Sequence, residues 1–80
     1  MSMPSLPKEK PLTPTQIRVL RNVRDGYEYD RHAEGMSGYA GAQTTMHSLV
    51  RRGLLHWRAD RYLVITALGR ATLREIDKER

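Results

Sequence analysis

The stretch TTMHSLVRRGLLHWRADRYLVITALGRATL, residues 44–73, decides the fold, because the spacing of its apolar residues changes along it. In its first part, a helical step of about 100° per residue places the apolar side chains on one arc, together with an alanine that precedes the stretch. The residues on this arc are Ala42, Met46, Leu49 and Val50. The spacing predicts a helix over residues 42–52.

A two-stranded hairpin is predicted next, over residues 55–65. The sequence LLHWRADRYLVIT alternates and is rich in β-branched and aromatic residues, and Ala59-Asp60 suits the turn between the strands. We expect Trp57 and Tyr62 to pack across the two strands. Stacking on a nucleic acid is the alternative role for this pair.

A last helix is predicted from TALGRATLREIDKE, in which Thr66 is a suitable N-cap. Gly69 falls inside this helix, where glycine costs up to about 1 kcal/mol relative to alanine. We therefore expect the backbone at Gly69 to lie close to another backbone segment.

The first helix is predicted from TPTQIRVLRNVRDG. Thr13 suits the N-cap, Pro14 suits the first helical position, and Gln16 completes a capping box with Thr13. Gly26 is expected to end the helix. An apolar stripe at helical spacing contains Ile17, Val19, Leu20 and Val23.

The two remaining segments lack a sustained hydrophobic period. All four prolines lie within the first fourteen residues, and we interpret residues 1–11 as a disordered arm that precedes a single domain over 12–80. Residues 27–41, YEYDRHAEGMSGYAG, contain three tyrosines and three glycines. For this segment we expect irregular chain, a short strand or one or two helical turns rather than a long helix.

Length and composition exclude several classes of protein. A chain of 80 residues buries only about 60% of its unfolded surface, which leaves little room for a large catalytic cleft. There is no cysteine, no apolar run near the ~20 residues of a membrane span, no HExxH or Ser-His-Asp signature and no glycine-rich phosphate loop. We expect a cytoplasmic protein that is not an enzyme, needs no cofactor and does not enter a membrane.

A metal site is a minor alternative for the segment EYDRHAE. Glu28, Asp30, His32 and Glu34 occupy alternate positions, so an extended chain would present them on one side, where they could bind a divalent cation. Any exposed acidic segment has the same pattern, so we predict no metal.

Charge is distributed unevenly along the chain. The net charge is +5, which favours anionic partners. Between Gly41 and Arg74 there are six arginines against Asp60 alone, whereas the segment Asp25–Glu34 has four acidic residues against Arg31. This split indicates one face offered to a polyanion, although chance clustering on a solvated surface would look similar.

The polar face of the helix over 42–52 has residue types that read DNA bases. Arginine can donate two hydrogen bonds to the edge of a guanine, and threonine and serine can donate or accept hydrogen bonds at base edges. A merely solvated helix face would have the same composition. The candidate residues are Thr44, His47, Ser48 and Arg51, flanked by Gln43, Thr45 and Arg52.

The order helix, connector, helix, hairpin, helix resembles the winged-helix family of DNA-binding domains. The resemblance is carried by LTPTQIRVL (12–20), TTMHSLVRRGLL (44–55) and YLVITALGRATL (62–73). In MarR-type regulators a helix ending in Arg-Gly-Leu is the recognition helix, the hairpin after it is the wing, and an I/L-T-x-x-G-R-x-x-L stretch opens the last helix. Here these motifs match 52–54 and 65–73.

The resemblance implies an α+β fold and a small regulator of transcription that binds double-stranded DNA, of a kind common in phages and mobile elements. Helix 42–52 would enter the major groove, and Arg58 and Arg61 would hold phosphates from the wing. Two features depart from the family. The apolar helix that usually precedes the recognition helix is replaced by acidic, glycine-containing chain, and the long flanking helices of MarR-type dimers are missing, so a homodimer does not carry over from the family and stays open.

The second hypothesis is a protein-binding adaptor or inhibitor on the same scaffold. Tyrosine and methionine are enriched at protein interfaces, and an acidic connector is poorly suited to DNA. The contact surface would then contain Tyr27, Tyr29, Met36 and Tyr39 of the 27–41 segment. These tyrosines could instead complete the thin core.

Overall fold

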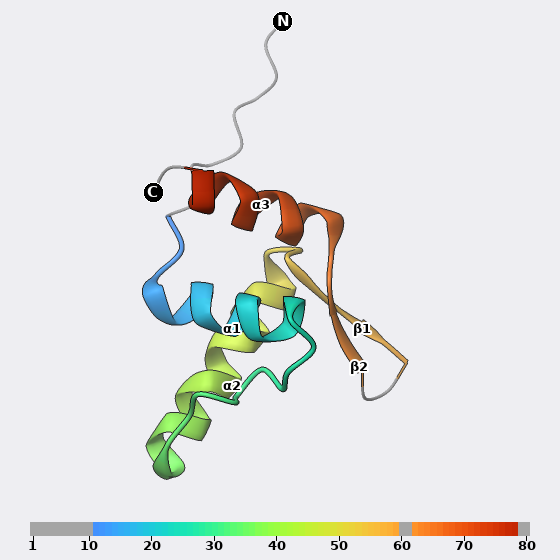
Figure 1. Ribbon diagram of the computed structural model, residues 1–80. Helices are drawn as coiled ribbons and strands as arrows, with labels where there is room; N and C mark the ends of the chain where they lie inside the picture. The colour runs from blue at the N-terminus through green and yellow to red at the C-terminus, as the bar shows by residue number, and fades with distance from the viewer. Residues whose placement is uncertain (1–10, 60–61, 79–80) are drawn as a thin grey trace, which may run out of the picture.

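The computed structural model of the chain describes residues 11–59 and 62–78 (Figure 1). In order along the chain, the elements are α1 (Pro14–Arg24), α2 (Gly35–Arg51), β1 (Leu55–Arg58), β2 (Tyr62–Ile65) and α3 (Ala67–Lys78). The predicted arm lies almost entirely outside the described residues, as do Asp60 of the predicted turn and Arg61. The fold is a small α+β arrangement of three helices and one antiparallel hairpin.

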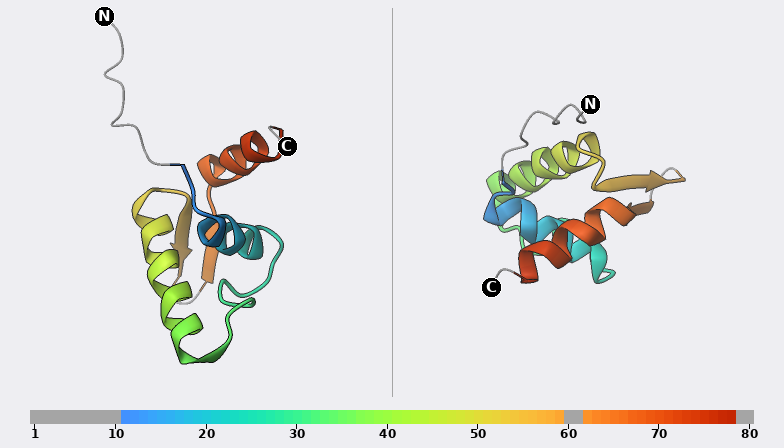
Figure 2. Two further views of the ribbon diagram at one scale, coloured as in Figure 1. Left: turned by 90° about the vertical axis from the view of Figure 1, so that its left-hand side faces the viewer. Right: turned by 90° about the horizontal axis from the view of Figure 1, so that it is seen from above.

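Helix α1 lies between α2 and α3, and it packs against both (Figure 2). The hairpin stands beside this stack, in contact with α1 and α2. The connector between α1 and α2 runs along the side of α2 that faces α1, so the opposite side of α2 is uncovered (Figures 1 and 2).

All five elements contribute to one apolar core. The apolar stripes of the helices and the apolar residues Leu55 and Ile65 of the hairpin meet in this core. Ile17 and Val23 of α1 and Val50 of α2 are partly buried against it, which confirms the predicted apolar faces of both helices. The buried residues of this core are Val19, Leu20, Met46, Leu49, Leu54, Leu55, Ile65 and Leu73.

Helix α1 begins and ends as predicted. The hydroxyl of Thr13 accepts from the Gln16 backbone N–H at 3.1 Å, and the Gln16 side-chain oxygen accepts from the Thr13 N–H at 2.9 Å. At the other end, Gly26 has a φ of +88°. Its N–H reaches the Val23 carbonyl at 3.1 Å, and the next N–H, of Tyr27, reaches back to the Asn22 carbonyl at 2.8 Å. Glycine suits this turn because it adopts positive φ at little cost.

Helix α2 begins at Gly35, seven residues before the predicted start at Ala42. Of the alternatives expected for residues 27–41, helical turns are the one that forms over 35–41, but these turns belong to a long helix, which was not expected. Glycine weakens a helix by only about 1 kcal/mol per residue, and elongation from an established helix adds one hydrogen bond per residue. The packed half of α2, with Ala42, Met46 and Leu49 buried, provides that established helix. The extension is exposed, which is why its sequence has no apolar period.

Helix α2 ends in the same kind of turn as α1. Gly53 has a φ of +80°, its N–H donates to the Val50 carbonyl at 3.0 Å, and the Leu54 N–H donates to the Leu49 carbonyl at 3.0 Å. Leu49 and Leu54 are both buried in the core, as is common for this cap. The cap therefore fixes the direction in which the chain enters the hairpin.

The hairpin has the predicted bounds, but its aromatic pair does not form as expected. In the strand register Trp57 lies opposite Leu63, and Tyr62 lies opposite Arg58. Because successive side chains alternate between faces, Trp57 follows Leu55 on the core-facing side, beyond the core itself. The exposed fractions are 39% for Trp57 and 70% for Tyr62, so these rings are not a buried cross-strand pair.

The junction between the hairpin and α3 confirms the expected close approach at Gly69. The Thr66 hydroxyl accepts from the Gly69 N–H at 2.9 Å, which makes Thr66 the predicted cap. The same hydroxyl lies 2.7 Å from the Gly53 carbonyl oxygen, and the Thr66 N–H donates to the Leu54 carbonyl at 3.1 Å. A Cβ atom placed on Gly69 would lie 2.3 Å from that Leu54 oxygen.

We expect Gly41→Ala to stabilise the protein by about 1 kcal/mol, because Gly41 is exposed within α2 and a Cβ there meets no atom within 4 Å. Urea unfolding followed by circular dichroism measures the change. Gly35→Ala is the matched control, since Gly35 has a φ of +71° and alanine is strained there. Destabilisation by Gly41→Ala would contradict the helical extension.

Candidate nucleic-acid interface

The uncovered side of α2 presents a continuous exposed stripe. Gln43, Thr44, His47 and Arg51 are all exposed, as the polar arc of the sequence predicted. The N-terminal extension lengthens the stripe by two further turns, through Ala40 and Met36, which lie at helical spacing from Thr44. A helix of 17 residues is about 25 Å long, so the stripe extends well beyond the predicted helix 42–52.

Two of the predicted DNA-binding residues lie at the edge of this stripe. Ser48 is half-buried, and its hydroxyl accepts from the Gln16 side-chain nitrogen at 3.3 Å. Since Gln16 also closes the capping box of α1, this contact helps to set the position of α2 on α1. Arg52 is half-buried at the C-cap of α2. The exposed stripe is therefore narrower than the arc predicted from the sequence.

The hairpin adds a second exposed cation. Arg58 ends β1 and shares the outward face of the hairpin with His56, which sequence reasoning did not select. The alternation of side chains along a strand could have predicted it, because His56 follows the apolar Leu55 and must therefore point to the opposite face. Arg51 and Arg58 form no ion pair with another described residue, so both guanidinium groups are available to an external anion. Arg61, the second predicted cation of the hairpin, lies outside the described residues.

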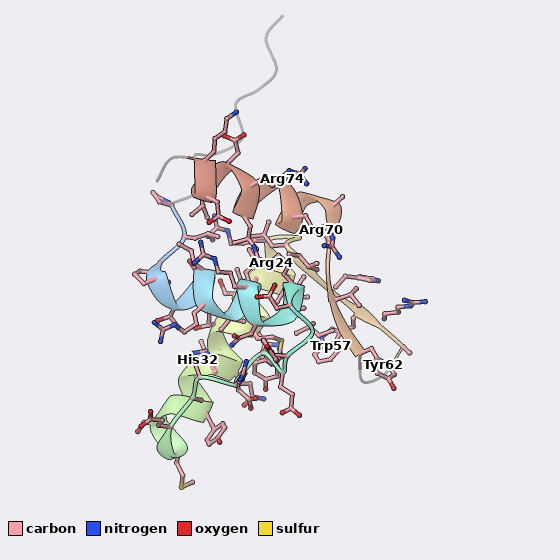
Figure 3. The ribbon with its side chains drawn as sticks, viewed as in Figure 1. Arg24, His32, Trp57, Tyr62, Arg70 and Arg74 are labelled. Atoms are coloured by element: carbon pink, nitrogen blue, oxygen red, sulfur yellow. The ribbon has the colours of Figure 1, made fainter. Side chains whose placement is uncertain are left out.

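Further basic side chains lie on α1 and α3. Arg70 and Arg74 lie on α3, which α1 separates from α2 (Figure 3). Arg21 and Arg24 of α1 pair with Asp77 of α3. The basic residues of the second half of the chain thus lie on three elements, α2, the hairpin and α3, and Arg70 is at the end of α3 that meets the hairpin (Figure 3).

Arg24 also pairs with the carboxylate beside it. Its guanidinium nitrogen Nε lies 2.8 Å from Asp25 Oδ1, and this hydrogen bond raises the pKa of Arg24 and lowers that of Asp25. Asp25 at the end of α1 is therefore already partnered by a cation within the chain.

The connector from α1 to α2 is folded into turns rather than extended. The Arg31 N–H donates to the Glu28 carbonyl at 3.0 Å, and the Ala33 N–H donates to the Asp30 carbonyl at 2.8 Å. His32 Nδ1 lies 3.0 Å from the Asn22 side-chain nitrogen. The extended geometry that would have aligned the acidic residues with His32 is thus not adopted, and no metal-binding group is present among the described residues.

The four residues proposed for a protein interface are divided between two places. Tyr27 and Tyr29 belong to the connector, where Tyr29 packs partly buried against the core. Met36 and Tyr39 lie on the first turns of α2, with exposed fractions of 89% and 52%. Two of the four residues thus belong to the connector and two to α2.

A groove opens between the connector and the core-facing side of the hairpin, a feature that sequence reasoning missed. Its volume is about 490 Å³, and four aromatic rings line it together with two carboxylates. Figure 3 shows Trp57 between the hairpin and the connector. The lining residues of interest are Tyr27, Glu28, Tyr29, Asp30, Trp57 and Tyr62.

None of the helices that the structure describes combines the length and apolarity needed to cross a bilayer. Comparison of the chain with protein-family models, with curated proteins and with solved structures found no match.

Proposed function

We propose that the protein binds double-stranded DNA as a winged-helix regulator of transcription, with α2 as the recognition helix and the hairpin as the wing. The order of three helices with an antiparallel hairpin before the last one is compatible with the winged-helix layout. The major groove of B-DNA is wide enough to admit an α-helix, and a whole side of α2 is uncovered.

The observation that carries this proposal is the exposed stripe on α2. Thr44, His47 and Arg51 are polar, exposed and spaced to face one way, and they sit on the side of α2 opposite its buried residues. Hydroxyl, imidazole and guanidinium groups offer the donors and acceptors that base edges require. Arg58, exposed on the adjoining hairpin, provides a cation for the phosphate backbone.

The departure from the family has a structural counterpart. The described residues contain no separate helix between α1 and α2; the turns of the connector and the extension of α2 occupy this part of the chain. The position of α2 is instead supported by the Gln16–Ser48 hydrogen bond and by the buried packing of α2 on α1. We infer that these contacts hold α2 at a fixed angle, as a recognition helix requires.

The test is selection of duplexes from a random pool by the full chain, followed by affinity measurements on selected and scrambled sequences. We expect Thr44→Ala/His47→Ala to reduce the preference for selected over scrambled DNA by about tenfold or more, because each good base contact discriminates by about 1–3 kcal/mol. Arg58→Ala should weaken binding to both sequences alike.

The double variant Thr15→Ala/Thr72→Ala is the matched control, since both side chains are polar and lie on α1 and α3, outside the exposed stripe of α2. If the pool yields no enriched sequence, or if Thr44→Ala/His47→Ala keeps the full preference, α2 is not the reading helix.

A further inference from the structure

We propose that the groove between the connector and the hairpin binds an arginine side chain of a partner polypeptide. This surface is separate from the exposed stripe of α2, and its role does not depend on DNA binding. The groove is lined by residues of the connector, by Val23 of α1, by the core-facing side of the hairpin and by Tyr62 at the start of β2. The stripe, in contrast, lies on the side of α2 turned away from α1.

The first argument is the amount of exposed aromatic surface. Tyr27, Trp57 and Tyr62 are exposed by 49%, 39% and 70%, and all three line this one groove. Small soluble domains seldom gather large exposed rings at one place without a partner to cover them. The volume of about 490 Å³ falls within the range of ligand-binding sites.

The second argument is charge complementarity. Glu28 and Asp30 line the groove, and none of its lining residues is a lysine or an arginine, although the chain as a whole carries a net charge of +5 and Arg31 stacks on the Tyr27 ring. Burial raises the pKa of the Tyr29 phenol, and the carboxylates of Asp30 and Glu28 raise it further, as expected for a site of negative potential. A phosphate backbone would be repelled here, whereas a cation would be attracted.

The third argument is a contact already present in the chain. The guanidinium carbon of Arg31 lies 3.8 Å from the centroid of the Tyr27 ring. Guanidinium groups stack on aromatic rings and pair with carboxylates through two parallel hydrogen bonds, so arginine satisfies both features of the groove at once. Lysine would satisfy the charge but not the stacking geometry.

The fluorescence of Trp57 provides a direct test, because it is the only tryptophan of the chain and lies in the groove. The full chain would be titrated with a short capped peptide of alternating arginine and glycine. The comparison peptide has citrulline at each arginine position, which keeps the shape and removes the charge. We expect a saturable change of the Trp57 emission with the arginine peptide and at least tenfold weaker binding of the citrulline peptide.

Two pairs of variants localise the site. Glu28→Gln/Asp30→Asn should weaken arginine-peptide binding at least tenfold, whereas Glu34→Gln/Glu75→Gln makes the same charge change outside the groove and should leave it unchanged. Tyr62→Leu should weaken binding and Tyr39→Leu should not. Both tyrosines are mainly exposed, so neither change removes core packing, and far-ultraviolet circular dichroism checks the fold.

Three results would overturn the proposal. Equal binding of the citrulline peptide would show that charge is not recognised. Equal weakening by both pairs of carboxylate variants would show general electrostatic attraction without a site. Displacement of the peptide by duplex DNA, with a change of Trp57 emission, would assign the groove to the nucleic-acid surface instead. The peptide titration contains no DNA, which is added only in the displacement experiment. A failure of the arginine peptide to bind therefore does not count against the proposed binding of DNA by α2 and the hairpin.

Discussion

Gly69→Ala is expected to destabilise the protein by about 3 kcal/mol or more, the largest effect of any single substitution considered. The added Cβ would lie 2.3 Å from the Leu54 carbonyl oxygen and 2.7 Å from a side-chain carbon of Ile65. Neither the backbone of Leu54 nor the buried Ile65 can give way cheaply, and overpacking of this kind costs about 1–3 kcal/mol even where side chains can adjust. Helix α3 would have to move away from the hairpin.

That movement would also break the hydrogen bonds that join the two elements. The Thr66 N–H and hydroxyl bind carbonyls of the Gly53-Leu54 segment, and these bonds require α3 to stay in place. A domain of this size has a free energy of unfolding near the lower end of about 5–15 kcal/mol, so a loss of 3 kcal/mol removes much of it. Thermal and urea unfolding measure the loss.

Gly41→Ala makes the same chemical change in another helix and should move the midpoint in the opposite direction. An unchanged or raised midpoint for Gly69→Ala would show that α3 does not lie against the Leu54 carbonyl.

Arg51→Ala/Arg58→Ala is expected to weaken binding to random duplex DNA by about a hundredfold at ~50 mM salt. Each phosphate that an arginine neutralises contributes about −0.9 to the slope of log affinity against log salt, so loss of two such contacts lowers the affinity steeply when salt is low. Both side chains are exposed on the proposed DNA surface. The parent chain and the variant can be compared by fluorescence anisotropy of a labelled duplex.

The control for this variant is Arg18→Ala/Arg74→Ala. It removes the same two charges, also from exposed positions, but these lie on α1 and α3. Since α1 and α3 lie on one side of α2, away from its exposed stripe, we expect at most a small loss of affinity. An equal loss of affinity in both double variants would show that DNA is attracted by the net charge alone, and that α2 and the hairpin do not form a specific binding surface.

The parts of the fold that were predicted from sequence are those determined by local chemistry. The Thr13–Gln16 capping box, the stop at Gly26 and the alternating strands each depend on interactions between residues a few positions apart. The close approach at Gly69 could be predicted because glycine is unfavourable in a helix interior unless a larger side chain would not fit. The Leu54 carbonyl leaves no room for a Cβ atom at this position.

The features that were missed depend on tertiary contacts. The extension of α2 from Gly35 has three glycines and no apolar period, so only its continuity with the packed half of the helix makes it helical. The exposed Trp57 and Tyr62 could not be placed, because the strand register puts them on opposite faces of the hairpin and the position of the connector decides that both line the groove. The contact of Ser48 with Gln16 likewise spans 32 positions in the sequence.

The most direct test of the central claim, that α2 and the hairpin bind DNA, is the salt dependence of binding to random duplex, measured by anisotropy for the parent and both double variants. Random duplex offers Arg51 no specific base site, so we count it there as a phosphate contact. If Arg51, Arg58 and Arg61 each neutralise one phosphate, the slope is about −2.7, and the affinity falls about fortyfold between ~50 and ~200 mM salt. Arg18→Ala/Arg74→Ala should keep this slope, and Arg51→Ala/Arg58→Ala should reduce it to about −0.9. No binding at ~50 mM salt, or one slope shared by all three proteins, would contradict the claim.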